Sequence, residues 1–242
     1  ASLRSAPGKA LVVDFRDFSI NPLTVDVASA DLGWLVINTN TPHELAGGEF
    51  AARREANEAV TGAMGLDYLR NALPEDLTCA GMSEREAKQC RLDLVDHTVN
   101  RALAALEETG QPRTFPRGWV RHTLHDMTLV ERAAYLLGRK DAGEQVDWSE
   151  LGRLFTESFV SMRDELRVSR REIDLAADTC LTTGALGARL VGGGFGGAVM
   201  ALLPAHLLGS AAERVALAYA QQGYADPEFL PMVAGFPADR DI

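Results

Sequence analysis

The chain has 242 residues, of which 46% are hydrophobic and 24% charged, as is typical of a globular protein with a sizeable core. Its formal net charge of -10 argues against non-specific binding to nucleic acid or to an anionic membrane surface. The sequence has no apolar run of about 18 residues, and its three cysteines form no CxxC pair. We therefore expect a cytoplasmic protein without a disulfide framework or a structural zinc site.

Three short β-branched runs lie near the start of the chain, at 9–15, 21–27 and 33–39, with turn-like stretches between them. We predict that they are strands of one antiparallel meander. The pattern then changes to helix-forming residues, and 47–65 is predicted to be a helix with Glu49 in its first turn.

Predicted helices dominate the middle of the chain. Ser83 is followed by Glu86 at the spacing of a capping box, which predicts a helix from there to about Glu108. Apolar residues recur near the helical period in two further stretches, which predicts helices at 119–141 and 148–166.

The last third of the chain mixes helices and strands. Ser169 is predicted to cap a helix that ends at Gly184. Next come a predicted helix over 204–222, with Pro204 near its start, and a final strand over 228–235. Strands on both sides of a helical block predict an α+β fold, in which sheet and helices form layers.

A glycine-rich stretch lies between the predicted helices of this last third. The sequence GARLVGGGFGGAVMALL, residues 187–203, has five glycines within six positions between two predicted strands. Each glycine costs about 0.5–1 kcal/mol relative to alanine inside regular structure, so the backbone there needs either positive φ or a close neighbour. A tightly packed hairpin is one interpretation, and a backbone cradle for an anion or a sugar is the other. A strand follows the loop and the Walker lysine is missing, so neither common nucleotide-binding fingerprint fits.

Two groups of polar residues could indicate chemistry, and for both we prefer a structural role. His122 and His125 lack a third ligand at helical spacing, so we interpret them as exposed or capping residues and not as metal ligands. Arg53, Arg54 and Arg163 lie in mixed-charge runs, which predicts surface ion pairs. No Ser, Cys or His lies in a recognisable nucleophile motif, and we assign no catalytic residue.

Four stretches, in the family's order, resemble galactokinases within the GHMP kinase superfamily. They are PHELAGGEFAARREANE at 42–58, VRHTLHDMTLVERAAYLLGRKD at 120–141, MRDELRVSRREID at 162–174 and the glycine stretch at 187–203. Together they extend over most of the chain, and their combination is more specific to galactokinases than to the superfamily as a whole.

The resemblance implies a GHMP-kinase-like fold with a ferredoxin-like C-terminal domain. Residues 1–50 would be strands at the end of the N-terminal kinase domain, and 51–242 would be the C-terminal domain, with a helical insertion near 71–118. In galactokinases a sugar motif, an ATP phosphate loop and a segment with the catalytic aspartate precede the strand that 9–15 resembles. We expect these segments to lie upstream of Ala1, and we expect the 242-residue chain to be inactive alone.

The implied activity is ATP-dependent transfer of a phosphoryl group to the anomeric hydroxyl of galactose, with Mg²⁺. Phe50, Gly193 and Gly194 are expected to bind the sugar, and Gly192 the ATP cofactor. No metal ligand is assigned, because the resemblance implies that the Mg²⁺ ligands lie mainly in the N-terminal part. The partners expected are the small-molecule sugar and ATP, and the oligomeric state is not predicted.

Two positions depart from the galactokinase pattern. Pro42 stands where many members have an arginine near the catalytic aspartate, and its loss removes one means of keeping that aspartate ionised. Phe50 stands where they have a tyrosine, and loss of a sugar-binding hydroxyl weakens sugar discrimination. Two alternatives therefore stay open: a non-catalytic sugar and ATP sensor, and a kinase of a different sugar.

Overall fold

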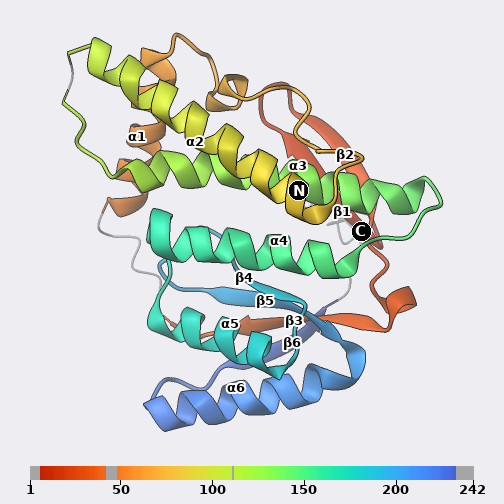
Figure 1. Ribbon diagram of the computed structural model, residues 1–242. Helices are drawn as coiled ribbons and strands as arrows, with labels where there is room; N and C mark the ends of the chain where they lie inside the picture. Colours follow the sequence, from red (N-terminus) through yellow and green to blue (C-terminus); the bar gives the residue numbers. More distant parts are fainter. Residues whose placement is uncertain (1–5, 42–47, 111, 233–242) are drawn as a thin grey trace, which may run out of the picture.

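The computed structural model describes residues 6–41, 48–110 and 112–232. A sheet unit, made of a four-stranded sheet and two helices, lies beside a helical part that carries a two-stranded hairpin (Figure 1). Antiparallel sheets layered with helices confirm the predicted α+β fold class. Among the helices described, none is long and apolar enough to span a bilayer.

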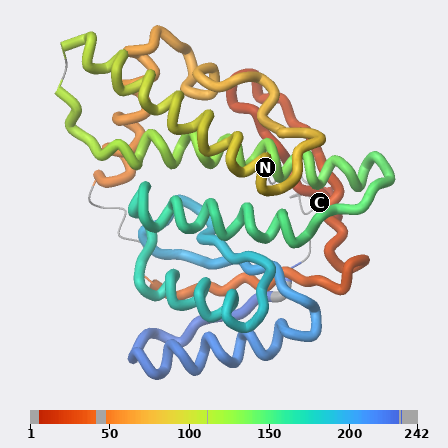
Figure 2. Tube along the Cα trace, viewed as in Figure 1, coloured from red at the N-terminus to blue at the C-terminus, as the bar shows by residue number. Residues whose placement is uncertain are grey.

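The four-stranded sheet has the order β4-β5-β3-β6, and each neighbouring pair is antiparallel. Its strands are β3 (Leu32–Asn38), β4 (Gly187–Val191), β5 (Ala198–Pro204) and β6 (Glu228–Met232). In Figure 2, β3 from the orange start of the chain runs among blue strands from its end. The sheet therefore closes the chain on itself over a long sequence separation.

Two helices complete the sheet unit, α5 (Arg171–Thr183) and α6 (Leu208–Gln222), which pack on each other and on the sheet. The order β3, α5, β4, β5, α6, β6 is the split βαβ arrangement of a ferredoxin-like domain, as expected. Helices α1 to α4 occupy the connection from β3 to α5. The division of the chain near residue 50 stays a prediction, although β3 lies before it and both neighbours of β3 lie after it.

The predicted three-stranded meander is wrong. β1 (Lys9–Asp14) and β2 (Ser19–Thr24) pair only with each other in the described chain, and they pack on the helical part. A turn ending at Asp31, with φ of 53°, separates β2 from β3. β3 buries Leu35 and Ile37 and is paired on both edges, whereas most of β2 is exposed. The buried apolar strand therefore lies within the larger sheet, where both its edges are paired.

The helical part contains four helices in addition to the hairpin. They are α1 (Glu49–Ala63), α2 (Glu84–Glu108), α3 (Arg117–Asp141) and α4 (Trp148–Ser161). The predicted capping box is confirmed, because Ser83 and Glu86 each bind the other's backbone N–H. α3 contacts α1, α2, α4 and β2, so it is the centre of this part.

Helix α4 passes so close to the start of β4 that Gly152 and Gly187 have no room for a side chain. A Cβ on Gly187 would lie 1.9 Å from the Gly152 carbonyl oxygen, and one on Gly152 would lie 2.3 Å from the Leu186 oxygen. The Ala188 N–H donates to Thr156 Oγ1 at 3.4 Å. α4 thereby covers the outer edge of β4, which would otherwise be open to pairing with another chain.

Two predicted boundaries in the last third differ from the structure. Ser169 does not cap α5: its hydroxyl donates to Asp174 Oδ1 at 2.6 Å, and Arg170 takes the N-cap position in an extended conformation. Pro204 ends β5, and a short 3-10 turn separates it from α6. Gly184 ends α5 with φ of 109°, as predicted for a C-cap glycine.

Candidate functional site

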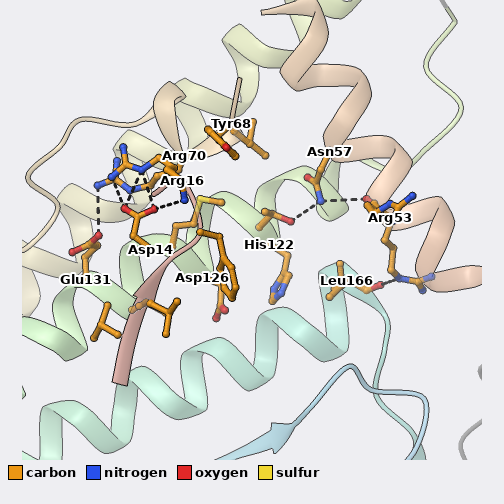
Figure 3. A pocket seen from close by; sticks show the side chains of 18 of the residues that line it. Asp14, Arg16, Arg53, Asn57, Tyr68, Arg70, His122, Asp126, Glu131 and Leu166 are labelled. Atoms are coloured by element: carbon orange, nitrogen blue, oxygen red, sulfur yellow. Dashed lines mark hydrogen bonds and ion pairs between the residues drawn. The ribbon is translucent and has the colours of Figure 1, made fainter. Parts of the chain in front are cut away.

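A cavity of about 650 Å³ opens between the hairpin, α1 and α3 (Figure 3). Small-molecule sites commonly have volumes of about 300–1,000 Å³, so the cavity is large enough for a metabolite. Val12 and Phe15 line it from the hairpin, Phe50 and Asn57 from α1, and His122 from α3. Most of the lining surface is apolar, and its polar side chains come from the hairpin side, from α3 and from Arg53, Arg54 and Asn57 of α1.

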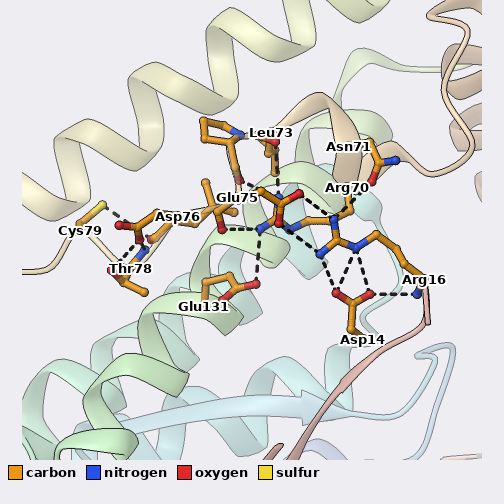
Figure 4. Close-up of polar contacts among 12 residues, drawn as sticks. Asp14, Arg16, Arg70, Asn71, Leu73, Glu75, Asp76, Thr78, Cys79 and Glu131 are labelled. Atoms are coloured by element: carbon orange, nitrogen blue, oxygen red, sulfur yellow. Dashed lines mark hydrogen bonds and ion pairs between the residues drawn. The ribbon is translucent and has the colours of Figure 1, made fainter. Parts of the chain in front are cut away.

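The first polar group joins the hairpin to the turn after α1 (Figure 4). Arg16 Nη2 donates to Asp14 Oδ2 at 2.7 Å, and its Nη1 donates to Glu75 Oε1 at 3.1 Å. These bonds lower the pKa values of Asp14 and Glu75, so both carboxylates are ionised at neutral pH. Arg70 Nη2 lies 3.5 Å from Glu131 Oε1. Each of these charges has a partner, so this end of the cavity fastens the hairpin.

The second polar group lies on α3 and α4. His122 Nδ1 lies 3.0 Å from Ser161 Oγ, and Ser158 donates to Asp126 Oδ1 at 2.5 Å. Burial lowers the pKa of His122, so the imidazole is neutral at physiological pH. A neutral histidine and a half-buried carboxylate therefore border the cavity from α3.

The expectation that both histidines are exposed or capping is wrong. His122 is 7% exposed and His125 3% exposed, because both face the α3–α4 contact. His125 Nε2 lies 3.0 Å from Glu157 Oε1, and Lys88 of α2 binds the same carboxylate. In the described ranges no three carboxylate, thiol or imidazole side chains form a group that could hold a metal.

Phe50 lines the cavity, and the glycine loop lies next to the Phe50 ring without belonging to the cavity lining itself. Phe50 is 56% exposed, and a Cβ on Gly193 would lie 3.9 Å from its ring. Gly192 is exposed, with φ of 89° and no atom within 4 Å of its Cβ position. Gly194 is buried, and a Cβ there would lie 2.5 Å from Val168 Cβ. Tight packing thus explains Gly194, whereas Gly192 and Gly193 present bare backbone to solvent.

The expected site residues are therefore brought together, but their roles stay predictions. The loop is fastened to the end of β3, where Thr39 Oγ1 donates to the Gly197 carbonyl at 2.6 Å. Pro42, one of the two departures from the galactokinase pattern, lies outside the described residues.

Of the arginines predicted to form surface ion pairs, Arg53 is the one whose buried position the sequence analysis missed. The predicted surface pairs are confirmed for Arg54 with Glu58 at 3.2 Å and for Arg163 with Asp164 at 2.8 Å. Arg53, however, is 8% exposed and does not belong to the surface. It lies on α1 three residues before the buried Ala56, and this helical spacing is the signal that could have identified it.

Comparisons with known proteins show what the chain is similar to. Residues 140–225 match the family described as GHMP kinases C terminal. A galactokinase of Mycobacterium bovis is 34% identical over 94% of the chain and 53% of its own length. One from Streptomyces coelicolor is 32% identical over 99% of the chain and 54% of its own length. The chain thus spans about half the length of the curated relatives it matches.

A solved structure supports the fold. Lactococcus lactis galactokinase, crystallised with galactose, superimposes with a TM-score of 0.63 at 21% identity. The match covers 95% of this chain and 52% of that protein. The chain is galactokinase-like and carries the C-terminal portion of a GHMP kinase.

Proposed function

We propose that this chain forms one wall of the sugar site in a kinase that transfers the γ-phosphoryl group of ATP to the anomeric hydroxyl of galactose. The proposal is supported by Phe50, which lines the cavity and lies next to the Gly193 position of the glycine loop, in a galactokinase-like chain. The complete activity belongs to a protein of galactokinase length. The 242 residues are expected to be inactive alone.

The chemistry expected of this wall is positioning. Phosphoryl transfer depends mainly on alignment and charge neutralisation, and it needs no covalent nucleophile. The exposed backbone at Gly192 and Gly193 allows a ligand to come closer than any side chain would permit. Phe50 offers an apolar ring to the sugar, without the hydroxyl that a tyrosine would add.

ATP and Mg²⁺ are the cofactors implied by the family. Gly192 fits the approach of a phosphate, because its Cβ position is open and its φ of 89° favours glycine. We assign Gly192 to ATP and Gly193 to the sugar, whereas the buried Gly194 supports the loop by packing on Val168. The described residues contain no cluster suited to Mg²⁺, so we derive no step through the metal from this chain.

The cell compartment proposed is the cytoplasm. Cys79, Cys90 and Cys180 are all free thiols in the structure, which suits a reducing environment.

The test uses the natural full-length polypeptide that contains this chain. ADP release is measured with galactose, N-acetylgalactosamine, arabinose and glucose, and galactose binding is measured by calorimetry. We expect ADP release in equal amount to galactose 1-phosphate. Turnover with another sugar alone would reassign the substrate. Galactose binding without turnover would support a sensor. The absence of both binding and turnover with every sugar tested would overturn the proposal.

A further inference from the structure

We propose that Arg53 is the positioning residue that sets the distance between Phe50 and the glycine loop. The inference rests on the proposed function, because it concerns the two sides of the same sugar site. Arg53 lies one helical turn after Phe50 on α1, and its side chain runs into the interior. Its guanidinium reaches two segments that are far away in the sequence.

The first segment is the end of the π-helix Met162–Leu166, which continues α4. Arg53 Nε donates to the Leu166 carbonyl at 2.7 Å (Figure 3). Arg53 Nη2 donates to the Arg167 carbonyl at 2.9 Å. Arg167 has φ of 58°, an uncommon value for a residue with a side chain. The planar guanidinium therefore binds two successive carbonyls at the point where the chain leaves the helix.

The second segment is the glycine loop. The guanidinium lies between two rings, 4.8 Å from the centre of Trp119 and 4.9 Å from that of Phe195. Phe195 is buried with φ of 60°, and its N–H donates to the Val168 carbonyl at 2.7 Å. Arg53 thus contacts the loop through the Phe195 ring and holds the backbone next to Val168, against which Gly194 packs.

The charge on Arg53 favours a geometric role over a simple contribution to stability. Its nearest carboxylate oxygen among the ion pairs described is Glu49 Oε2, at 3.9 Å, and its third hydrogen bond goes to the Glu49 carbonyl at 2.6 Å. A buried cation without a close ionic partner is unfavourable compared with an apolar side chain of similar volume. Only a flat guanidinium can bind two carbonyls and stack between two rings at once. Phe50 lies on α1, the helix that carries Arg53, and Gly193 lies on the loop that the guanidinium reaches.

The test compares Arg53→Lys with Arg139→Lys in the natural full-length polypeptide. Arg139→Lys is the matched control, because Arg139 lies outside the cavity lining and pairs with Glu144 at the surface. Lysine keeps the charge at residue 53 but cannot bind both carbonyls and stack on both rings. Hydrogen exchange of 192–197 and of β5 is followed, with kcat and KM for galactose measured well below the unfolding temperature of each variant.

For Arg53→Lys we expect exchange at 192–197 to become about tenfold faster, with β5 changed less than about twofold. We expect KM for galactose to rise at least about tenfold, with a smaller change in kcat. Arg139→Lys should change neither the exchange nor KM. Unchanged exchange and unchanged KM in folded Arg53→Lys would overturn the inference, and so would faster exchange spread evenly over the sheet unit. If the wild type has no galactose-dependent activity, the proposed function fails and the exchange pattern alone decides on Arg53.

Discussion

The sheet unit and the helical part bury different kinds of side chain. In the part of the chain that the structure describes, the buried residues that carry or can carry a charge near neutral pH lie on α1 to α4, namely Arg53, Arg91, His122, His125, Arg132 and Glu150. The apolar cluster around the sheet includes Cys180 and Tyr219, and burial raises the pKa of both, to about 12 for Cys180. The sheet unit therefore depends on apolar burial and close backbone contact, and the helical part depends in addition on buried polar partners. Changes in packing should damage the first, and changes in charge or pH should damage the second.

The largest loss in the free energy of unfolding is expected for a substitution where α4 contacts the sheet. Gly187→Ala places a Cβ 1.9 Å from the Gly152 oxygen, so two backbones must move apart. We expect a loss of more than about 4 kcal/mol in the free energy of unfolding, or no folding at all, in chemical denaturation. Gly138→Ala on α3 is the control: its Cβ meets no atom within 4 Å, so it should stabilise by about 0.5–1 kcal/mol. Equal stabilities for the two variants would contradict the close α4–β4 contact.

The next effect concerns the buried pair of α3 and α4. Arg132 donates to both oxygens of Glu150 at 2.7 and 3.1 Å, and both residues are less than 5% exposed. Arg132→Met leaves a buried carboxylate alone, and we expect a loss of about 3–5 kcal/mol in urea unfolding. The double variant Arg132→Met with Glu150→Leu should recover part of that loss. A double variant less stable than Arg132→Met would show that the charge pair is not what holds these helices together.

A smaller effect is expected from pH. Burial lowers the pKa of His122 below its ordinary value of 6.5. The unfolded chain therefore binds this proton more readily, so the stability linked to His122 is present above pH 6.5 and decreases as the pH falls. One proton changes the free energy of unfolding by at most about 1.4 kcal/mol per pH unit. In urea unfolding at pH 7.5, 6.5 and 5.5, the free energy of unfolding should depend less on pH for His122→Gln than for the wild type. Equal pH dependence in the two proteins would mean that His122 is not buried in its neutral form.

The smallest effect is expected at the surface of α1. Arg54 and Glu58 lie 3.2 Å apart and are both exposed. Arg54→Ala should lower the free energy of unfolding by no more than about 1 kcal/mol, and less in high salt. A loss comparable with that of Arg132→Met would remove the distinction between buried and surface pairs in the helical part.

The contrast between the two regions also explains what the sequence could predict. The capping box at Ser83 and the apolar periods of the long helices are local signals, and they identified α2, α3 and α4 correctly. Strand pairing depends on distant residues, so no local pattern showed that β3 joins β5 and β6 and not β2. Charged residues are usually exposed, so Arg53 was assigned to the surface.

The candidate site shows the same division. Galactokinase-like motifs identified Phe50 and the glycine loop, and these meet in the structure. Local sequence could not separate the tasks of neighbouring glycines: Gly194 packs on Val168, and Gly193 faces Phe50.

Galactose binding by Gly193→Val, measured in the natural full-length polypeptide, probes the wall of the sugar site. Gly193 is exposed and its Cβ position is 3.9 Å from the Phe50 ring, so valine should fold normally and narrow the space between loop and ring. For Gly193→Val we expect an unfolding temperature close to that of the wild type. We expect its Kd for galactose to be at least about tenfold higher, which corresponds to about 1.4 kcal/mol of binding free energy. Equal galactose affinity in the two proteins would contradict the claim that this loop and Phe50 form a wall of the sugar site.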